Sequence, residues 1–281
     1  MARGLRQTQT MFTNRFSKYL WLMGSMLLVA RLALASADNE QASCLSVLGQ
    51  DTSLEGRQLS SNLEVLSWNI QKGSNAGWAK DLVSVSRDID LVFIQEASLQ
   101  AKIPSVIPAG LHSVFAAGYS TATLETGVMT LSSESSSSSC MLTSIEPWLG
   151  TAKATSITEF PLQGREDRLL AINLHAVNFD FGLQSLQMQL GALTDVLLNH
   201  PGPVILAGDL NTWSDTRQAF VDNFMREHGL RPITFEPDLR TTAFGNALDH
   251  IYVRGLRTED AQVIPVSTSD HNPLRVRLAL Q

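Results

Sequence analysis

The sequence predicts an α/β fold in which two stacked β-sheets are flanked by helices. Many short apolar segments have the length of strands and only a few have helical spacing, which argues against a purely parallel sheet. Hydrophobic residues make up 44% of the 281 residues, enough for a sizeable core. The sequence has no internal repeat and no interior linker, so we expect one domain at about residues 62–281.

The first half of this domain is predicted to contain four strands and one helix. Residues 63–70 form an apolar strand that ends in polar residues, and residues 76–88 have helical spacing. A short buried strand at residues 90–96 ends on a carboxylate. Two further strands are expected at residues 111–117 and 126–131.

The second half is predicted to contain two helices and six strands. A serine-rich stretch at residues 132–139 indicates a solvated loop. Leucines recur at helical spacing through residues 182–199, and a second helix is expected at residues 215–228. The strands are expected at residues 151–160, 168–174, 203–208, 247–253, 261–266 and 274–280.

Residues 1–37 have the composition of a secretory signal peptide. Four cations and no acid in residues 1–18 precede an apolar run at residues 19–30, and Ala35-Ser36-Ala37 provides a small-x-small cleavage site. The run is shorter than the roughly 20 residues that cross a bilayer. We therefore expect cleavage after residue 37 and export to the periplasm or the medium. The alternatives are a membrane anchor at residues 19–37 or, less in keeping with the flanks, a buried helix.

Removal of this segment changes the charge of the protein. The formal net charge is −6, and loss of the five cations in residues 1–37 leaves 16 Lys and Arg against 27 Asp and Glu, or −11. Polyanions usually bind basic surfaces, so this charge weakens a nucleic-acid function without excluding it. Residues 38–61 look like a polar tether. Cys44 and Cys140 either pair in an oxidising compartment or remain thiols, and their spacing does not decide.

Polar residues suited to phosphoryl chemistry stand at the ends of apolar strands. Phosphate-ester hydrolysis needs oxygen ligands for Mg²⁺ or Mn²⁺, a group that takes a proton from water, and donors for the phosphate oxygens. Taken alone, each residue is better explained by a structural role, such as a solvated carboxylate, a turn, a helix cap or a core histidine. The segments are Trp68-Asn69, Gln95-Glu96, Asn173-Leu174-His175, Gly208-Asp209-Leu210-Asn211, Leu248-Asp249-His250 and Ser269-Asp270-His271-Asn272-Pro273.

In their order along the chain, these motifs resemble those of the endonuclease/exonuclease/phosphatase superfamily, which has the DNase I-like fold. The resemblance covers about residues 63–281, and it is closest to small bacterial YafD-type proteins through residues 127–132, 171–182 and 269–274. It implies a four-layer sandwich, in which two stacked mixed β-sheets are flanked by helices.

The resemblance also implies a metal site. Glu96 corresponds to the principal metal ligand, with Asn69 and Asp270 nearby, and the ion is Mg²⁺ or Mn²⁺. Position 71 is a glutamine where some nucleases of the family have an acid that helps to hold metal. The affinity for metal and the number of ions therefore stay open.

Five further residues correspond to the catalytic set of the family. Asp209 orients or deprotonates the attacking water, and Asn211 holds the phosphate. His271, paired with Asp249, contacts the scissile phosphate. His175 lies on the opposite side of the phosphate as a donor or an acid.

The expected function is metal-dependent hydrolysis of a phosphate ester by a monomer, most simply of a phosphodiester in nucleic acid. The rival substrates are a phospholipid head group and a small phosphorylated compound. A non-catalytic binding module on the same fold is the rival from another class of protein. Such a module would be expected to lose Glu96, Asp209 or His271 first, and all three are present.

Overall fold

The computed structural model describes residues 39–50, 58–107, 110–180 and 182–281. The expected signal peptide or anchor, residues 1–37, lies outside these ranges. The fold described below is that of residues 41–281. Among the described residues, none of the helices combines the length and the apolar character that a membrane span requires.

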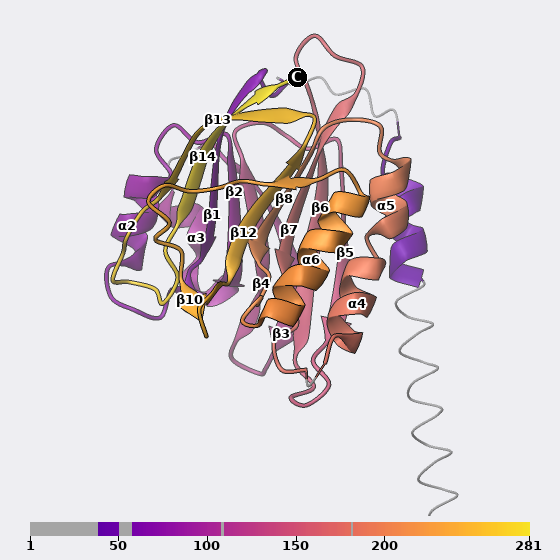
Figure 1. Ribbon diagram of the computed structural model, residues 1–281. Helices are drawn as coiled ribbons and strands as arrows, with labels where there is room; N and C mark the ends of the chain where they lie inside the picture. The colour runs from indigo at the N-terminus through magenta and orange to yellow at the C-terminus, as the bar shows by residue number, and fades with distance from the viewer. Residues whose placement is uncertain (1–38, 51–57, 108–109, 181) are drawn as a thin grey trace, which may run out of the picture. The chain divides into compact units, whose positions relative to one another are not determined.

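The first sheet has six strands in the order β13-β14-β1-β2-β4-β3 (Figure 1). Only β1 and β2 are parallel neighbours in it, and the other pairs are antiparallel. The strands are β1 (Asn62–Asn69), β2 (Leu91–Ser98), β3 (His112–Ser120), β4 (Glu125–Ser132), β13 (Leu256–Val263) and β14 (Leu274–Leu280).

The second sheet also has six strands, in the order β5-β6-β7-β8-β12-β9. Its one parallel pair is β7 with β8. The strands are β5 (Ser138–Ile145), β6 (Ala152–Pro161), β7 (Arg168–His175), β8 (Val204–Asp209), β9 (Arg231–Pro232) and β12 (Asp249–Arg254). A separate short hairpin pairs β10 (Thr242–Ala243) with β11 (Asn246–Ala247).

Helices lie on the outer side of each sheet (Figure 1). On the first sheet these are α2 (Trp78–Val85) and α3 (Ile103–Val106), and two short 3₁₀ turns flank that sheet, η1 (Gln71–Gly73) and η2 (Leu99–Ala101). On the second sheet they are α4 (Gln184–Gly191), α5 (Thr194–Asn199) and α6 (Asp215–Glu227).

Alternate residues of the central strands explain the layers. In β8, Ile205 and Ala207 pack in the cluster between the sheets, whereas Val204 and Leu206 pack in the cluster under the helices. Side chains of a strand point alternately to its two faces, so a strand that is buried on both faces is apolar throughout. The order helix, sheet, sheet, helix confirms the predicted four-layer class of fold.

The predicted elements differ from the observed ones mainly at sheet edges. Edge strand β5 begins inside the serine-rich stretch, where Ser138 and Ser139 pair with β6, so this part of the predicted loop is strand. Edge strand β13 lies earlier than expected because its exposed side chains are polar. Edge strands often carry polar residues and give a weak apolar signal. The single helix expected at residues 182–199 is two helices that separate after Gly191, a weak helix former.

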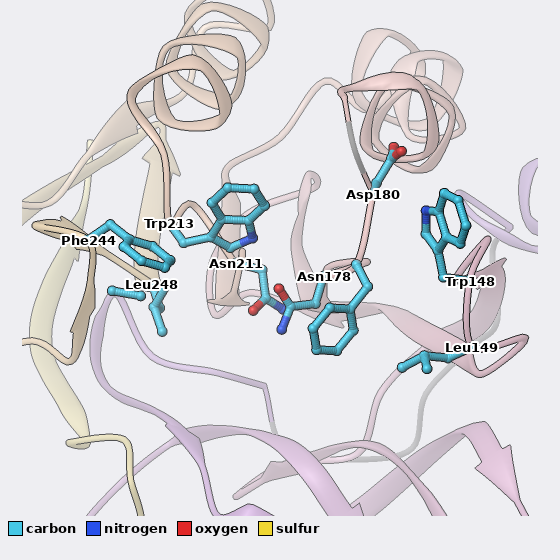
Figure 2. Close-up of a pocket in the computed structure, with 10 residues that line it drawn as sticks. Trp148, Leu149, Asn178, Asp180, Asn211, Trp213, Phe244 and Leu248 are labelled. Atoms are coloured by element: carbon cyan, nitrogen blue, oxygen red, sulfur yellow. The ribbon is translucent and has the colours of Figure 1, made fainter.

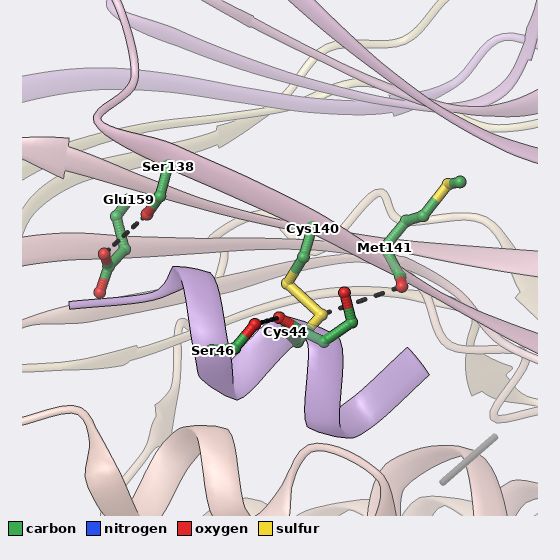
Figure 3. The surroundings of a disulfide bond; sticks show 7 residues. Cys44, Ser46, Ser138, Cys140, Met141 and Glu159 are labelled. Carbon is green, nitrogen blue, oxygen red and sulfur yellow. Dashed lines mark hydrogen bonds between the residues drawn. A yellow bond between two sulfur atoms is a disulfide. The ribbon is translucent and has the colours of Figure 1, made fainter. Parts of the chain in front are cut away.

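Residues 41–47, within the expected polar tether, form a helix that a disulfide joins to β5. Cys44 bonds to Cys140, 96 positions away, with 5.3 Å between the Cα atoms (Figure 3). The Cys44 side chain is fully buried in the cluster that α4–α6 form with the second sheet. The Gly49 amide donates a hydrogen bond to the Glu159 carboxylate at 2.7 Å. This segment is therefore held to the second sheet at two points.

Candidate active site

Strand pairing brings the ends of β7, β8 and β12 to one edge of the second sheet. Because β7 and β8 are parallel, their last residues, His175 and Asp209, are direct partners. Strand β12 is antiparallel to β8, so its first residue, Asp249, lies opposite Asp209 as well. Gly208 allows this approach, since a Cβ there would lie 1.8 Å from the Leu174 carbonyl oxygen.

Asp209 is at the centre of a buried network of polar groups. Its Oδ2 accepts a hydrogen bond from Asn69 Nδ2 at 2.9 Å, and its Oδ1 accepts one from the Asn211 amide at 3.0 Å. The Nε2 atoms of His175 and His271 lie 3.6 Å and 3.8 Å from Oδ2. Burial raises the pKa of Asp209 to about 6, although the charge of His271 acts in the opposite direction.

His271 is held as a protonated imidazole. Its Nδ1 donates to Asp249 Oδ2 at 2.7 Å, and Trp68 Nε1 donates to its carbonyl oxygen at 2.8 Å. Burial alone would lower the pKa of His271, but the charge and hydrogen bond of Asp249 and the charge of Asp209 raise it to about 10. The Nε2 atom of this imidazolium lies 3.8 Å from Asp209 Oδ2.

His175 has the opposite protonation state. Burial, reinforced by the positive charge of Lys153, lowers the pKa of His175 well below its usual value. Lys153 Nζ donates to His175 Nε2 at 3.0 Å and lies 3.8 Å from Glu146 Oε1. His175 is therefore neutral in this arrangement, and Lys153 carries the positive charge on that side of the site.

Lys153, Glu146 and Arg217 are the site residues that the sequence analysis missed. Glu146 is buried and accepts a hydrogen bond from the Asn178 amide at 2.9 Å. Arg217 is buried and donates to the carbonyl oxygens of Asn211 and Val177, which joins the loops after β7 and β8. No motif surrounds these residues in the sequence, so no signal distinguished them from surface charges.

The expected metal ligands lie around η1. The backbone amide of Gln71 donates a hydrogen bond to Asn69 Oδ1 at 3.1 Å, and its side-chain Nε2 donates one to Asp270 Oδ2 at 3.2 Å. The next residue, Lys72, pairs with Glu96 Oε2 at 2.7 Å. The Asn69 and Asp270 side chains are thus joined through Gln71, and Glu96 is joined to the same turn through an ammonium group.

Glu96 has an unusual backbone conformation. Its φ is 49°, and the pairing of β2 with β4 shifts register between Ile94 and Ala97. A bulge of this kind re-aims a side chain and is common beside active sites. The Glu96 side chain remains 21% exposed, in contrast to its buried strand neighbours.

Two groups of side chains offer atoms that could hold a metal ion. Glu96, Asp270 and Asn69 offer oxygen atoms, which suit Mg²⁺ or Mn²⁺. The Lys72 ammonium group pairs with Glu96, so a positive charge is already accommodated beside this carboxylate. Asp209, Asp249 and His271 have potential ligand atoms within 4.8 Å of one another. A protonated His271 has no lone pair for a metal, so we assign this second group to proton handling instead.

All eight site residues expected from the sequence lie among the described residues. Six of them form one network of direct contacts, and Glu96 and Asp270 join it through Lys72 and Gln71. The six are Asn69, His175, Asp209, Asn211, Asp249 and His271.

Comparison with known proteins agrees with the fold and the motifs. The family model described as the Endonuclease/Exonuclease/phosphatase family matches residues 66–271. A UPF0294 protein of Vibrio cholerae is 38% identical over 224 residues, which are 79% of each chain.

Two solved structures show the same fold. An endonuclease/exonuclease/phosphatase from Beutenbergia cavernae superposes with a TM-score of 0.61 at 15% identity, over 80% of this chain and 72% of that one. A mannosyl-6-phosphatase from Bacteroides thetaiotaomicron superposes with a TM-score of 0.59 at 16% identity, over 78% of this chain and 100% of the other. At these identities the likeness bears on the fold alone.

Proposed function

The chain belongs to the endonuclease/exonuclease/phosphatase family, and on this basis we propose that it is a divalent-metal-dependent hydrolase of phosphodiester bonds. The position of Asp209 is the observation that supports this most directly. Its carboxylate is buried between His175 and His271 and fixed by Asn69. A carboxylate held in this way takes a proton from water or orients it, beside imidazoles that contact phosphate.

The cofactor that the ligand set suits is Mg²⁺ or Mn²⁺. Glu96, Asp270 and Asn69 Oδ1 would hold the ion, and Lys72 would have to release the Glu96 carboxylate. When bound, the ion neutralises phosphate oxygens and the charge that develops on the leaving oxygen.

Residues of the chain handle the protons and the phosphate oxygens. Asp209 takes a proton from water as the water oxygen bonds to phosphorus and one ester P–O bond breaks. His271, kept protonated by Asp249, donates through Nε2 to a non-bridging oxygen. Asn211 uses its second amide N–H for another phosphate oxygen, since the first bonds to a carbonyl, and Lys153 adds positive charge opposite His271. The leaving oxygen takes its proton from solvent.

We also propose that the protein is exported. The disulfide between Cys44 and Cys140 supports this, because the cytosol keeps thiols reduced. Fractionation with N-terminal sequencing should find a chain that begins at Asp38 outside the cytoplasm. An uncut chain on the outer face of the membrane would favour the anchor, and a full-length soluble chain in the cytoplasm would refute both versions.

The hydrolase proposal is tested with the purified full chain. Bis(p-nitrophenyl) phosphate, plasmid DNA, RNA and sphingomyelin are assayed after chelation and again with Mg²⁺ or Mn²⁺. We expect chelation to abolish turnover and the metal to restore it. Glu96→Gln should raise the metal concentration needed for half-maximal activity by about tenfold or more, as loss of a carboxylate ligand does.

Asp209→Asn is the decisive variant. It should lower kcat by about a hundredfold or more, as loss of a general base does. Asp88→Asn makes the same change at an exposed residue in the turn that follows α2 and should leave kcat unchanged. Full turnover by Asp209→Asn, or by the metal-free enzyme, would refute the proposal.

A further inference from the structure

A pocket of about 670 Å³ opens beside Asn211, and it has no part in the proton handling described above (Figure 2). Four loops form its walls. Trp148 lies on the loop between β5 and β6, Phe179 on the loop after β7, Trp213 on the loop between β8 and α6, and Phe244 at the tip of the β10–β11 hairpin. Pockets of this volume hold small-molecule ligands.

The pocket is continuous with the candidate active site. Asn211 lines it and also donates its backbone amide to Asp209 at 3.0 Å. Asn178 lines it as well and follows His175 by three residues. A phosphodiester whose phosphorus lies at Asp209 would therefore extend one of its two substituents into the pocket.

The lining is predominantly apolar. Seven of its ten described residues are apolar, and none of the ten carries a positive charge. Of its three polar residues, Asp180 accepts a hydrogen bond from the Ser185 amide at 2.7 Å, and Asn211 Nδ2 donates one to the Ala176 carbonyl oxygen at 2.9 Å. An apolar substituent suits such a lining, because polar atoms placed there would lose hydrogen bonds to water.

Large apolar side chains at the rim remain in contact with water. Phe244 is 90% exposed, Trp148 66% and Phe179 55%. Clustered exposure of this kind marks a binding surface on a soluble domain. The wall is also preorganised, since the Trp213 ring lies 5.4 Å from the Arg217 guanidinium and edge-on to Phe244 at 6.3 Å.

A nucleic acid fits this surface less well than a lipid does. Nucleobases stack on aromatic rings, but their flanking phosphates need cations, and neither the lining nor the net charge of −6 provides them. Building on the proposed function, we infer that the pocket binds the apolar tail of an amphiphilic phosphodiester, a phospholipid, whose phosphate lies at Asp209. Free lipid in solution and lipid in a bilayer share this chemistry.

The test compares diesters that differ only in their tails. Glycerophosphocholine, dihexanoyl- and diheptanoyl-phosphatidylcholine are assayed below their micelle-forming concentrations with the full chain and Mg²⁺ or Mn²⁺. We expect kcat/KM to rise about threefold or more for each added methylene that reaches the pocket. The same assay on vesicles of long-chain phosphatidylcholine distinguishes bilayer lipid from free lipid.

Two pocket variants and one matched control locate the effect. Phe179→Ser and Phe244→Ser should each lower the ratio of kcat/KM for the diheptanoyl lipid to that for glycerophosphocholine by about tenfold. Leu198→Ser changes a similarly exposed apolar residue on α5, outside the pocket, and should leave the ratio unchanged. Binding of Asp209→Asn to the vesicles, followed by co-sedimentation, should weaken about tenfold when Phe244→Ser is added.

The outcomes separate this inference from the proposed function. Hydrolysis of glycerophosphocholine with no gain from acyl chains would overturn the inference alone. Absence of phosphodiester turnover on any substrate would overturn the proposed function, and the vesicle assay would then decide whether the pocket binds lipid. Turnover of single-stranded DNA that falls in Phe179→Ser, with lipid turnover unaffected, would assign the pocket to nucleobases and overturn the inference.

Discussion

Asn69 donates a hydrogen bond from Nδ2 to Oδ2 of Asp209 at 2.9 Å, and this bond joins the last residue of a strand in one sheet to the last residue of a strand in the other. Both side chains are buried, so neither exchanges its partner for water. The position of the Asp209 carboxylate therefore depends on the stacking of the two sheets.

The pair formed by His271 and Asp249 is expected to act as a unit. Asp249→Asn keeps a hydrogen-bond acceptor for Nδ1 but removes the charge that keeps the imidazole protonated. We expect kcat to fall by about ten- to a hundredfold with little change in KM, because His271 donates mainly to charge that develops in the transition state. Steady-state kinetics of Asp249→Asn, with Asp88→Asn as the control, provide the measurement. An unchanged kcat in Asp249→Asn would remove Asp249 from the mechanism.

Lys153 is expected to act both on phosphate and on His175. Lys153→Met keeps the apolar stem and removes the ammonium group, so KM should rise or kcat should fall by about tenfold. The pKa of His175 should also rise, since the charge of Lys153 helps to lower it. An NMR titration of the imidazole tests this second effect. Lys80→Met, on the exposed side of α2, is the control, and a His175 pKa that does not move would show that the charge is not felt there.

The disulfide is expected to stabilise the domain. Replacement of both Cys44 and Cys140 by Ala opens a covalent loop of 96 positions, which should lower the free energy of unfolding by about 3–4 kcal/mol. Urea unfolding of the variant and of the native chain, with and without dithiothreitol, provides the measurement. The reductant should destabilise only the native chain, and equal stability of the two proteins would contradict the prediction.

Glu159 is expected to make stability depend on pH in the acid range. Burial would raise its pKa, but the bonds from His200 and from the Gly49 amide lower it from 4.5 to about 2. The folded state thus holds the carboxylate ionised where the unfolded chain takes up a proton. This contribution, on the order of 3 kcal/mol, is complete above pH 4.5 and is lost as the pH falls towards 2.

Urea unfolding at pH 7, 4 and 3 measures this loss. Glu159→Gln should lower stability at pH 7 and flatten the profile below pH 4.5, whereas Glu227→Gln, at an exposed position of α6, should do neither. If the free energy of unfolding of Glu159→Gln falls with pH as steeply as that of the native chain, the acid sensitivity belongs to other carboxylates.

Most of the fold could be predicted from the sequence because the central strands are buried on both faces. Strands such as β2 and β8 begin with four consecutive apolar residues and are identifiable without their neighbours. Edge strands β5 and β13 were displaced or missed because one side of each meets solvent and carries polar residues. The helix break after Gly191 is a local preference that the leucine spacing concealed.

By itself, the sequence determined which residues are the candidates for the chemistry. Asp209, His271 and Glu96 stand in short motifs at strand ends, and that information is local. Only the tertiary structure decided how these residues are charged and what surrounds them. The protonated His271, the neutral His175 beside Lys153 and the apolar pocket beside Asn211 all arise from groups distant in the chain. Burial and electrostatic contact depend on proximity in space, which strand register and sheet stacking set and which no local pattern records.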